Sequence, residues 1–185
     1  MKVKRKSHLT ISRKEVLKQI FQLKITIMDI KPPIWRRILI SNHANFYELH
    51  LTIQKFFNWD NYHVHEFHFP HNRNPNHEIR LLGLDPGGKF PDDIGADFLS
   101  YHEAQEDEVR LCDVFSKNRR TLGYLYDFGD SWEHSIELEK IYPFKKGFKE
   151  PLCVGGKRAT PPEDCGGSWG YLDLLEILKN KRQGE

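Results

Sequence analysis

A change of hydrophobic period near the start of the chain most constrains the fold. From 21 to 27, apolar side chains occupy every second position, which predicts a half-buried strand. The segment 35–40 predicts a return strand. Pro32 and Pro33 cannot donate to a strand ladder, so they belong to the turn between the two strands. The chain therefore opens with a β-hairpin.

After this hairpin the period becomes helical. Asn45 and Glu48 stand where a capping box would begin a helix. The apolar residues that follow at helical spacing are Phe46, Leu49, Ile53, Phe56 and Phe57. We expect this helix to pack its apolar face on the sheet that contains the hairpin.

The middle of the chain predicts one strand and a long loop. Residues 62–69 alternate again, as in a strand, whereas 70–97 is rich in Pro, Gly, Asn and Asp. The acidic stretch 102–109 is typical of a solvated surface, and 112–120 predicts one helical turn.

The last third of the chain predicts a hairpin and a helix. Strands over 121–128 and 131–141 would join at Gly129-Asp130, a favoured two-residue hairpin loop. The closing helix carries Tyr171, Leu174, Leu175 and Leu178. Together these elements predict an α+β fold: a mixed or antiparallel sheet, a packed helix in a β-grasp-like start, and a C-terminal helix.

The length of 185 residues suits one domain. We place it at 21–180, after a basic arm or short helix at 1–20, where Ser12 and Glu15 have capping-box spacing, and before a tail at 181–185. Apolar residues make up 38% and charged residues 29%, which is typical of a soluble globular protein. The chain shows no apolar run of membrane-spanning length, and we expect a cytoplasmic protein without membrane contact.

The net charge of +2 is too small to predict nucleic-acid binding from bulk charge. Local basic clusters at 2–6, 117–120 and 179–182 keep nucleic acid as a candidate partner. No phosphate-cradling loop, nucleophile elbow, dinucleotide-binding motif or helix-turn-helix signature accompanies them. The common enzyme classes therefore receive no support, and the oligomeric state is not predicted.

The hairpin at Gly129-Asp130 yields the first candidate site. With a two-residue loop, Asp127 lies opposite Trp132 and diagonally across from His134 on one face. Asp127 could then orient the imidazole of a general base or metal ligand, or it could simply satisfy a core histidine, which is the interpretation we favour. Asp130 would bond nearby backbone N–H groups in the turn.

The pair His63 and His65 yields a second candidate. On a strand both rings would share one face, and His134 with Asp127 would complete a set of ligands for zinc or iron. Ten histidines make chance pairs common, however. No cofactor is therefore predicted, and a divalent metal ion is the alternative.

A third group surrounds the proline pair near the C-terminus. The three cysteines form no disulfide framework, which is typical of a reducing compartment. Cys153 and Cys165 could bind metal as thiolates or react near Arg158, but apolar packing is the favoured hypothesis. Glu163 and Asp164 could cap their loop or serve as pocket acids, and pairing with Arg158 is our first expectation.

Four blocks of the sequence resemble the plasmid pRiA ORF-three-like family, and they cover most of the chain from Phe21 to about Leu178. They are FQLKITIMDIKPPIWRRILI, LHLTIQKFFNWDNYHVHEF, YDFGDSWEHSIELEKI and CVGGKRATPPEDCGGSWGY. The resemblance implies a small α+β domain of bacteria and archaea, often encoded on plasmids or beside transposable elements. It implies no particular reaction. The family usually has a cysteine before the proline pair where this chain has Thr160, which counts against a shared thiolate metal site.

Our leading hypothesis is a noncatalytic binding or accessory domain, associated with mobile DNA, with a pocket formed by the candidate residues above. The first alternative is a metal-dependent hydrolase or nuclease that uses His63, His65, Asp127 and His134. The second is a structural protein-interaction module.

Overall fold

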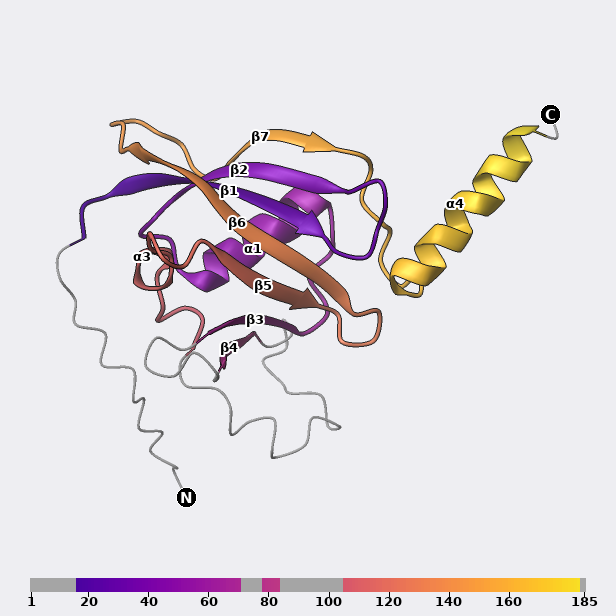
Figure 1. Cartoon of the computed structure of the whole chain (residues 1–185), viewed down its shortest axis with the longest axis horizontal. Coiled ribbons are helices and arrows are strands. Elements are labelled where there is room, and N and C mark those ends of the chain that lie inside the picture. The colour runs from indigo at the N-terminus through magenta and orange to yellow at the C-terminus, as the bar shows by residue number, and fades with distance from the viewer. Residues whose placement is uncertain (1–15, 71–77, 84–104, 184–185) are drawn as a thin grey trace, which may run out of the picture.

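The computed structural model describes residues 16–70, 78–83 and 105–183. The basic arm at 2–6 and the spacing of Ser12 and Glu15 lie outside these residues. The elements in chain order are β1 (Gln19–Ile27), β2 (Trp35–Ser41), α1 (Phe46–Phe57), β3 (His65–Pro70), β4 (Glu78–Gly83), α3 (Leu111–Val114), β5 (Thr121–Tyr126), β6 (Trp132–Pro143), β7 (Leu152–Lys157) and α4 (Gly167–Gln183) (Figure 1).

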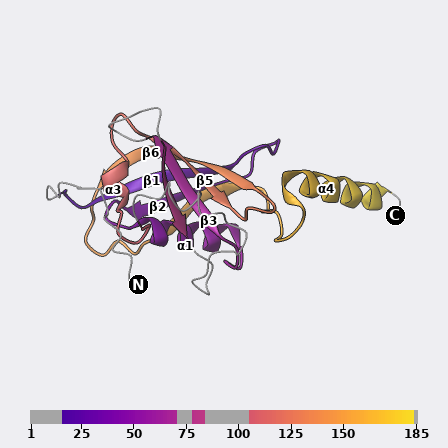
Figure 2. The same cartoon turned by 90° about the horizontal axis from the view of Figure 1, so that it is seen from below.

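The strands form one sheet in the order β4-β3-β5-β6-β1-β2-β7. Its six described pairings are all antiparallel. The α+β class is confirmed, whereas the β-grasp-like detail is not. Helix α1 covers one face of the sheet, and α4 extends away from it in both views (Figure 1, Figure 2).

Helix α1 forms where its sequence predicts. The Asn45 side chain accepts a hydrogen bond from the Glu48 N–H at 2.8 Å, and the Glu48 carboxylate accepts one from the Asn45 N–H at 2.8 Å. The helix buries Phe46, Leu49, Ile53 and Phe57 completely. This apolar stripe and the inward-facing strand residues make the core.

Strand β4 is an element that the prediction of mostly loop over 70–97 did not include. It pairs with β3 along its whole length, Leu81 is fully buried, and Arg80 forms an ion pair with Glu66 at 3.0 Å. Six residues between loop-rich flanks are too few to show a clear period. Strand β3 also begins at His65, three residues later than predicted, so His63 lies in the loop before it.

The β5–β6 register also differs from the prediction. Tyr126 pairs with Trp132 and Tyr124 with His134, so residues 127–131 form the turn and the two-residue loop is wrong. Asp127 and Ser131 adopt positive φ angles of 57° and 53°, which the turn needs and which the hairpin rule does not foresee. Tyr124 and Tyr126, rather than Asp127, therefore share the buried face of this hairpin with Trp132 and His134.

Candidate functional site

Four of the candidate residues meet where the sheet ends and α4 begins. We call His63, Asp127, Glu163 and Asp164 the His63 cluster. The Nε2 atom of His63 lies 3.2 Å from Asp164 Oδ1, 3.5 Å from Asp127 Oδ2 and 4.0 Å from Glu163 Oε2. Both His63 Nε2 and Glu163 Oε2 are buried atoms without a hydrogen-bond partner among the described residues. His63, Asp127 and Asp164 thus offer ligand atoms that all lie within 4.8 Å of one another, and Glu163 lies beside them.

Asp127 reaches this space because it caps the β5–β6 turn. Its Oδ1 atom accepts hydrogen bonds from the backbone N–H groups of Gly129 at 2.9 Å and Asp130 at 3.3 Å. The Ser131 N–H donates to the Asp127 carbonyl at 2.7 Å. These bonds fix the side chain and leave Oδ2 directed at His63.

Glu163 and Asp164 are oriented in the same way. Glu163 Oε1 accepts from the Asp60 N–H at 2.8 Å and from the Tyr126 hydroxyl at 3.1 Å. Asp164 Oδ2 accepts from the Tyr62 hydroxyl at 2.9 Å. Each acid of the cluster therefore uses one oxygen for a supporting hydrogen bond and presents the other to His63.

Burial makes the cluster electrostatically costly. The side chains of Asp127 and Glu163 are 8% and 10% exposed, whereas that of Asp164 is 64% exposed. Burial raises the pKa of Glu163, and the hydrogen bond to Asp164 raises the pKa of Tyr62 to about 12. A cation in this space would lower the cost of holding three carboxylates together.

The loop that carries two of these acids is docked on the sheet. The Trp59 indole N–H donates to the Pro161 carbonyl at 3.0 Å, and the Gly166 N–H donates to Asp130 Oδ2 at 3.1 Å. Gly167 has a φ of 66°, and a Cβ at this position would lie 2.4 Å from the Asp130 carbonyl oxygen. Asp130 thus accepts from a backbone N–H group, as expected, but this group belongs to Gly166 before α4, whereas the N–H groups of the turn are bound by Asp127.

His65 belongs to a separate, buried polar group, so the predicted pairing of His63 with His65 is wrong. His65 Nε2 lies 2.7 Å from Glu106 Oε2, and its ring stacks on that of His50 with centroids 3.4 Å apart. The Tyr124 hydroxyl donates to His50 Nδ1 at 2.8 Å, and His50 Nε2 donates to Asn61 Oδ1 at 2.5 Å. The physical reason is that β3 begins at His65, which turns the two imidazoles toward different neighbours.

Glu106 and His50 were missed by the sequence analysis. Glu106 lies in the acidic stretch assigned to a solvated surface, yet it is buried. His50 lies on α1 four positions after Phe46 and three before Ile53, so helical spacing places it on the apolar stripe, and this is the signal that could have found it. For Glu106 the only sequence signal is a polar residue embedded near buried apolar ones.

His134 is a core histidine, but Asp127 does not hold it. Its Nδ1–H donates to the carbonyls of Trp132 at 2.8 Å and Tyr124 at 3.2 Å. The Phe57 ring meets the imidazole edge-on. The predicted contact between Asp127 and His134 is wrong because the register shift places Asp127 in the turn.

Arg158 and the cysteines do not join the cluster. Arg158 is exposed after β7, and the expected pairing with Glu163 and Asp164 is wrong, since both acids face His63. Cys153 and Cys165 are free thiols; Cys165 packs against the core, and burial raises its pKa, which disfavours a thiolate. The structure thus favours apolar packing for Cys165.

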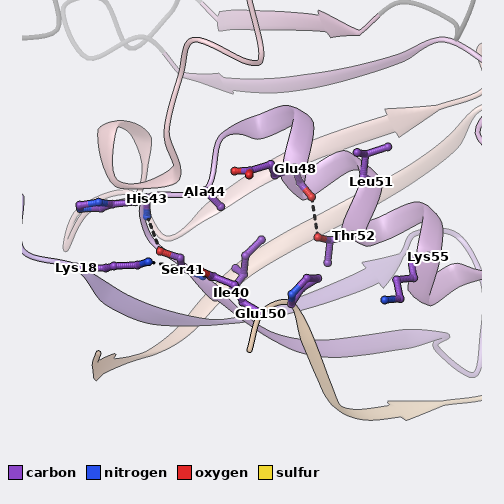
Figure 3. Close-up of a pocket in the computed structure, with 11 residues that line it drawn as sticks. Lys18, Ile40, Ser41, His43, Ala44, Glu48, Leu51, Thr52, Lys55 and Glu150 are labelled. Atoms are coloured by element: carbon purple, nitrogen blue, oxygen red, sulfur yellow. Dashed lines mark hydrogen bonds and ion pairs between the residues drawn. The ribbon is translucent and has the colours of Figure 1, made fainter. Parts of the chain in front are cut away.

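A groove of about 440 Å³ lies elsewhere, between α1 and the end of β2 (Figure 3). None of the predicted site residues lines it. Its polar groups largely bind one another: the Thr52 hydroxyl donates to the Glu48 carbonyl at 2.7 Å, and Lys18 Nζ lies 3.7 Å from Glu150 Oε1. The groove therefore shows no converging set of free donors or acceptors of the kind found at the His63 cluster.

The basic cluster at 117–120 is partly used by the fold, because the Arg120 guanidinium donates to the Leu138 carbonyl and, at 2.9 Å, to the Glu139 carbonyl. Lys179 and Lys181 are exposed on α4. No helix in the described ranges has the length and apolar character needed to span a membrane.

Comparison with known proteins agrees with the resemblance found in the sequence. Residues 19–185 match the family model described as plasmid pRiA4b ORF-3-like protein. The chain is 31% identical to uncharacterized protein y4hQ of Sinorhizobium fredii over 159 residues, which cover 86% of this chain and 73% of that protein. The chain also matches the crystal structure of MM3350, a protein of unknown function from Methanosarcina mazei Go1. The two sequences are 36% identical, the TM-score is 0.74, and the match covers 90% of this chain and 84% of the MM3350 chain. These matches, together with the fold, show that the chain belongs to the plasmid pRiA4b ORF-3-like family.

Proposed function

We propose that this protein is a noncatalytic binding domain whose ligand is a divalent transition-metal ion held by the His63 cluster. The observation that carries the proposal is the convergence of ligand atoms from His63, Asp127 and Asp164, beside the buried Glu163 Oε2 atom that makes no hydrogen bond among the described residues. A buried carboxylate oxygen or imidazole nitrogen without a partner is costly, and a bound cation removes that cost. The ion would hold the N-terminal end of α4 against the sheet.

The spacing of the donors supports this proposal. Ligand atoms about 2.1 Å from a tetrahedral ion lie roughly 3.4 Å apart. The distances from His63 Nε2 to the three carboxylate oxygens range from 3.2 to 4.0 Å, and this range includes that value. One imidazole with two carboxylates, and a third carboxylate nearby, suits zinc, manganese or iron better than calcium, which prefers six to eight oxygens.

Metal-dependent hydrolysis is the second candidate function, because the 64% exposed Asp164 leaves one side of the cluster open to solvent. A metal-bound water there could act as a nucleophile at neutral pH. The noncatalytic proposal is preferred because no sequence motif of a common enzyme class accompanies the cluster.

The test is metal analysis of protein made without a histidine tag, stripped with chelator and reloaded with zinc, manganese or iron(II). We expect one ion per chain and a metal-dependent rise in the melting temperature. Glu163→Gln should weaken affinity by at least about tenfold, because the amide carries no charge for the ion. Glu137→Gln, at an exposed acid on the outer sheet face, is the matched control and should bind as the wild type does.

Two results would contradict this proposal: no stoichiometric binding of any of the three ions, or equal affinity in Glu163→Gln and wild type. Circular dichroism checks that both variants stay folded. Hydrolysis of a phosphodiester by the loaded wild type, absent in Glu163→Gln, would instead favour the second candidate.

We also propose an accessory role linked to mobile DNA in a reducing cytoplasm. The family description names a plasmid, and the three cysteines are free thiols, which support these two points. Retention on duplex DNA that falls as salt rises is the expected result if nucleic acid is the partner. If the protein is not retained on DNA at low salt, nucleic acid is excluded as the partner.

A further inference from the structure

The end of β6 and its connection to β7 form a basic surface. Residues 140–149, which we call the lysine segment, contain Lys140, Lys145, Lys146 and Lys149 and no acidic residue. All four lysines are exposed, and none forms an ion pair with a residue that the structure describes. The segment lies at the end of the sheet opposite α4, and therefore away from the His63 cluster (Figure 1).

The two acids that border the lysine segment already have partners. Glu139 accepts a hydrogen bond from Arg37 Nη2 at 2.7 Å and another from Gln22 Nε2 at 2.7 Å. Glu150 accepts one from the Ser41 N–H, and its Oε1 atom lies 3.7 Å from Lys18 Nζ. The surface of the segment therefore keeps its positive charge, which attracts a polyanion.

Two aromatic rings lie exposed among these lysines, and contacts with the body hold both in place. Tyr142 is 37% exposed and Phe144 is 36% exposed. The Tyr142 hydroxyl donates to Gln22 Oε1 at 2.9 Å, and the Lys18 ammonium lies 4.5 Å from the centroid of the Phe144 ring. Rings that are already positioned lose little freedom when a planar ligand stacks on them.

The tip of the segment is polar. The Phe148 N–H donates to the Lys145 carbonyl at 3.0 Å, and Gly147 has a φ of 84°, as at the third position of a type II turn. The turn thus presents Lys146 to solvent, while Phe148 is half-buried. A loop that anchors in a membrane needs apolar side chains at its tip, so these features favour a polyanion in water.

We infer that the lysine segment binds single-stranded nucleic acid. Its lysines contact successive phosphates, and the rings of Tyr142 and Phe144 stack on unpaired bases. The bases of a duplex are stacked on one another and expose only their edges in the grooves, so they offer these rings no face. This site rests on the accessory role proposed above, because that role calls for nucleic acid, and it specifies the surface and the form of the strand.

The test is the fluorescence anisotropy of a labelled oligothymidine, titrated with the whole chain in chelator at several salt concentrations. Lys145→Gln with Lys146→Gln should weaken binding and reduce the slope of log Kd against log salt by about 1.4, because each phosphate contact to a single strand contributes about 0.7. Lys179→Gln with Lys181→Gln removes the same charge from exposed positions of α4. This matched control should bind as the wild type does.

Phe144→Leu separates stacking from charge. Leucine keeps an apolar side chain but has no ring, so the affinity for oligothymidine should fall about fivefold to about a hundredfold. The affinity for heparin, a polyanion without bases, should stay unchanged. Tyr142→Leu gives a second measurement of the same difference. Equal loss of affinity for both ligands in both variants would overturn the stacking role.

Three further results would overturn the assignment: no binding of oligothymidine at low salt, equal weakening by the α4 variant, or binding of phosphatidylserine vesicles that oligothymidine does not displace. Retention on duplex DNA that the Lys145 and Lys146 changes leave intact would also reject this surface, yet it would keep the accessory role. Failure of duplex and single strand together would reject both. Because chelator is present throughout, each outcome leaves the metal proposal unaffected.

Discussion

The buried histidines predict a loss of stability in mild acid. Burial lowers the pKa of His50 to about 3 and that of His134 to about 4, from an ordinary value of 6.5. Both imidazoles therefore stay neutral in the folded protein at pH 5.5, whereas the unfolded chain takes up a proton at each. Because the unfolded state binds more protons, the free energy of unfolding must fall as the pH falls below about 6.5.

The magnitude follows from proton linkage. For an unfolded pKa of 6.5 and a folded pKa of about 3 to 4, acidification from about pH 7.5 to about pH 5.5 costs roughly 1.3 kcal/mol per histidine. His50 and His134 together should lower the free energy of unfolding by between about 2 and 3 kcal/mol. This is a large share of the stability of an ordinary domain.

The pair His65 and Glu106 adds little to this change. Burial lowers the pKa of His65 to about 3 and raises that of Glu106 to about 7, so the folded pair holds one proton near pH 5.5. In the unfolded chain the histidine holds one proton and the glutamate none at that pH. The proton count of the pair is thus nearly the same in both states.

Urea unfolding at fixed ionic strength over this pH range is the assay, in chelator so that metal binding does not contribute. His134→Gln and His50→Gln should each remove about half of the pH dependence, and the double variant should remove most of it. A free energy of unfolding that stays constant or rises on acidification would refute the reasoning, as would single variants with the full wild-type slope.

Two further substitutions test the N-terminal cap of α1 and the N-terminal end of α4. Asn45→Ala removes the capping box and should cost about 1 kcal/mol in urea unfolding; an unchanged midpoint would show that the cap contributes nothing. Gly167→Ala should lower the thermal midpoint clearly more than Gly147→Ala, because both glycines have positive φ but only the Cβ at 167 meets the Asp130 carbonyl. If both alanine substitutions lowered the thermal midpoint equally, the N-terminal end of α4 would not be packed closely against the turn.

The elements with a strong period were predictable from the sequence. The opening hairpin and α1 follow directly from alternation and helical spacing, and the capping box of Asn45 and Glu48 fixes the start of the helix. The β5–β6 register was not predictable in the same way. Asp127 can cap a turn or continue a strand; in the structure its side chain accepts from the Gly129 N–H and its own N–H donates to the carbonyl of Val64, a residue distant in sequence.

The candidate site, like the fold, was predictable only in part from the sequence. His63 and Asp127 were identified as metal candidates, but their partners were assigned by strand periodicity, which gave His65 and His134. Backbone position decides which atoms meet. A start of β3 three residues later separates His63 from His65, and no local pattern reports that start.

The strand order has a consequence for how the protein is made. The interior strand β1 pairs with β2, which follows it in sequence, and also with β6, so that Ile25 pairs with both Arg36 and Ile136. During synthesis the first hairpin can form early, yet one edge of β1 stays unpaired until β6 has left the ribosome. An unpaired apolar strand edge is a template for wrong pairing, so premature termination before β6 should produce aggregating rather than partly folded chains.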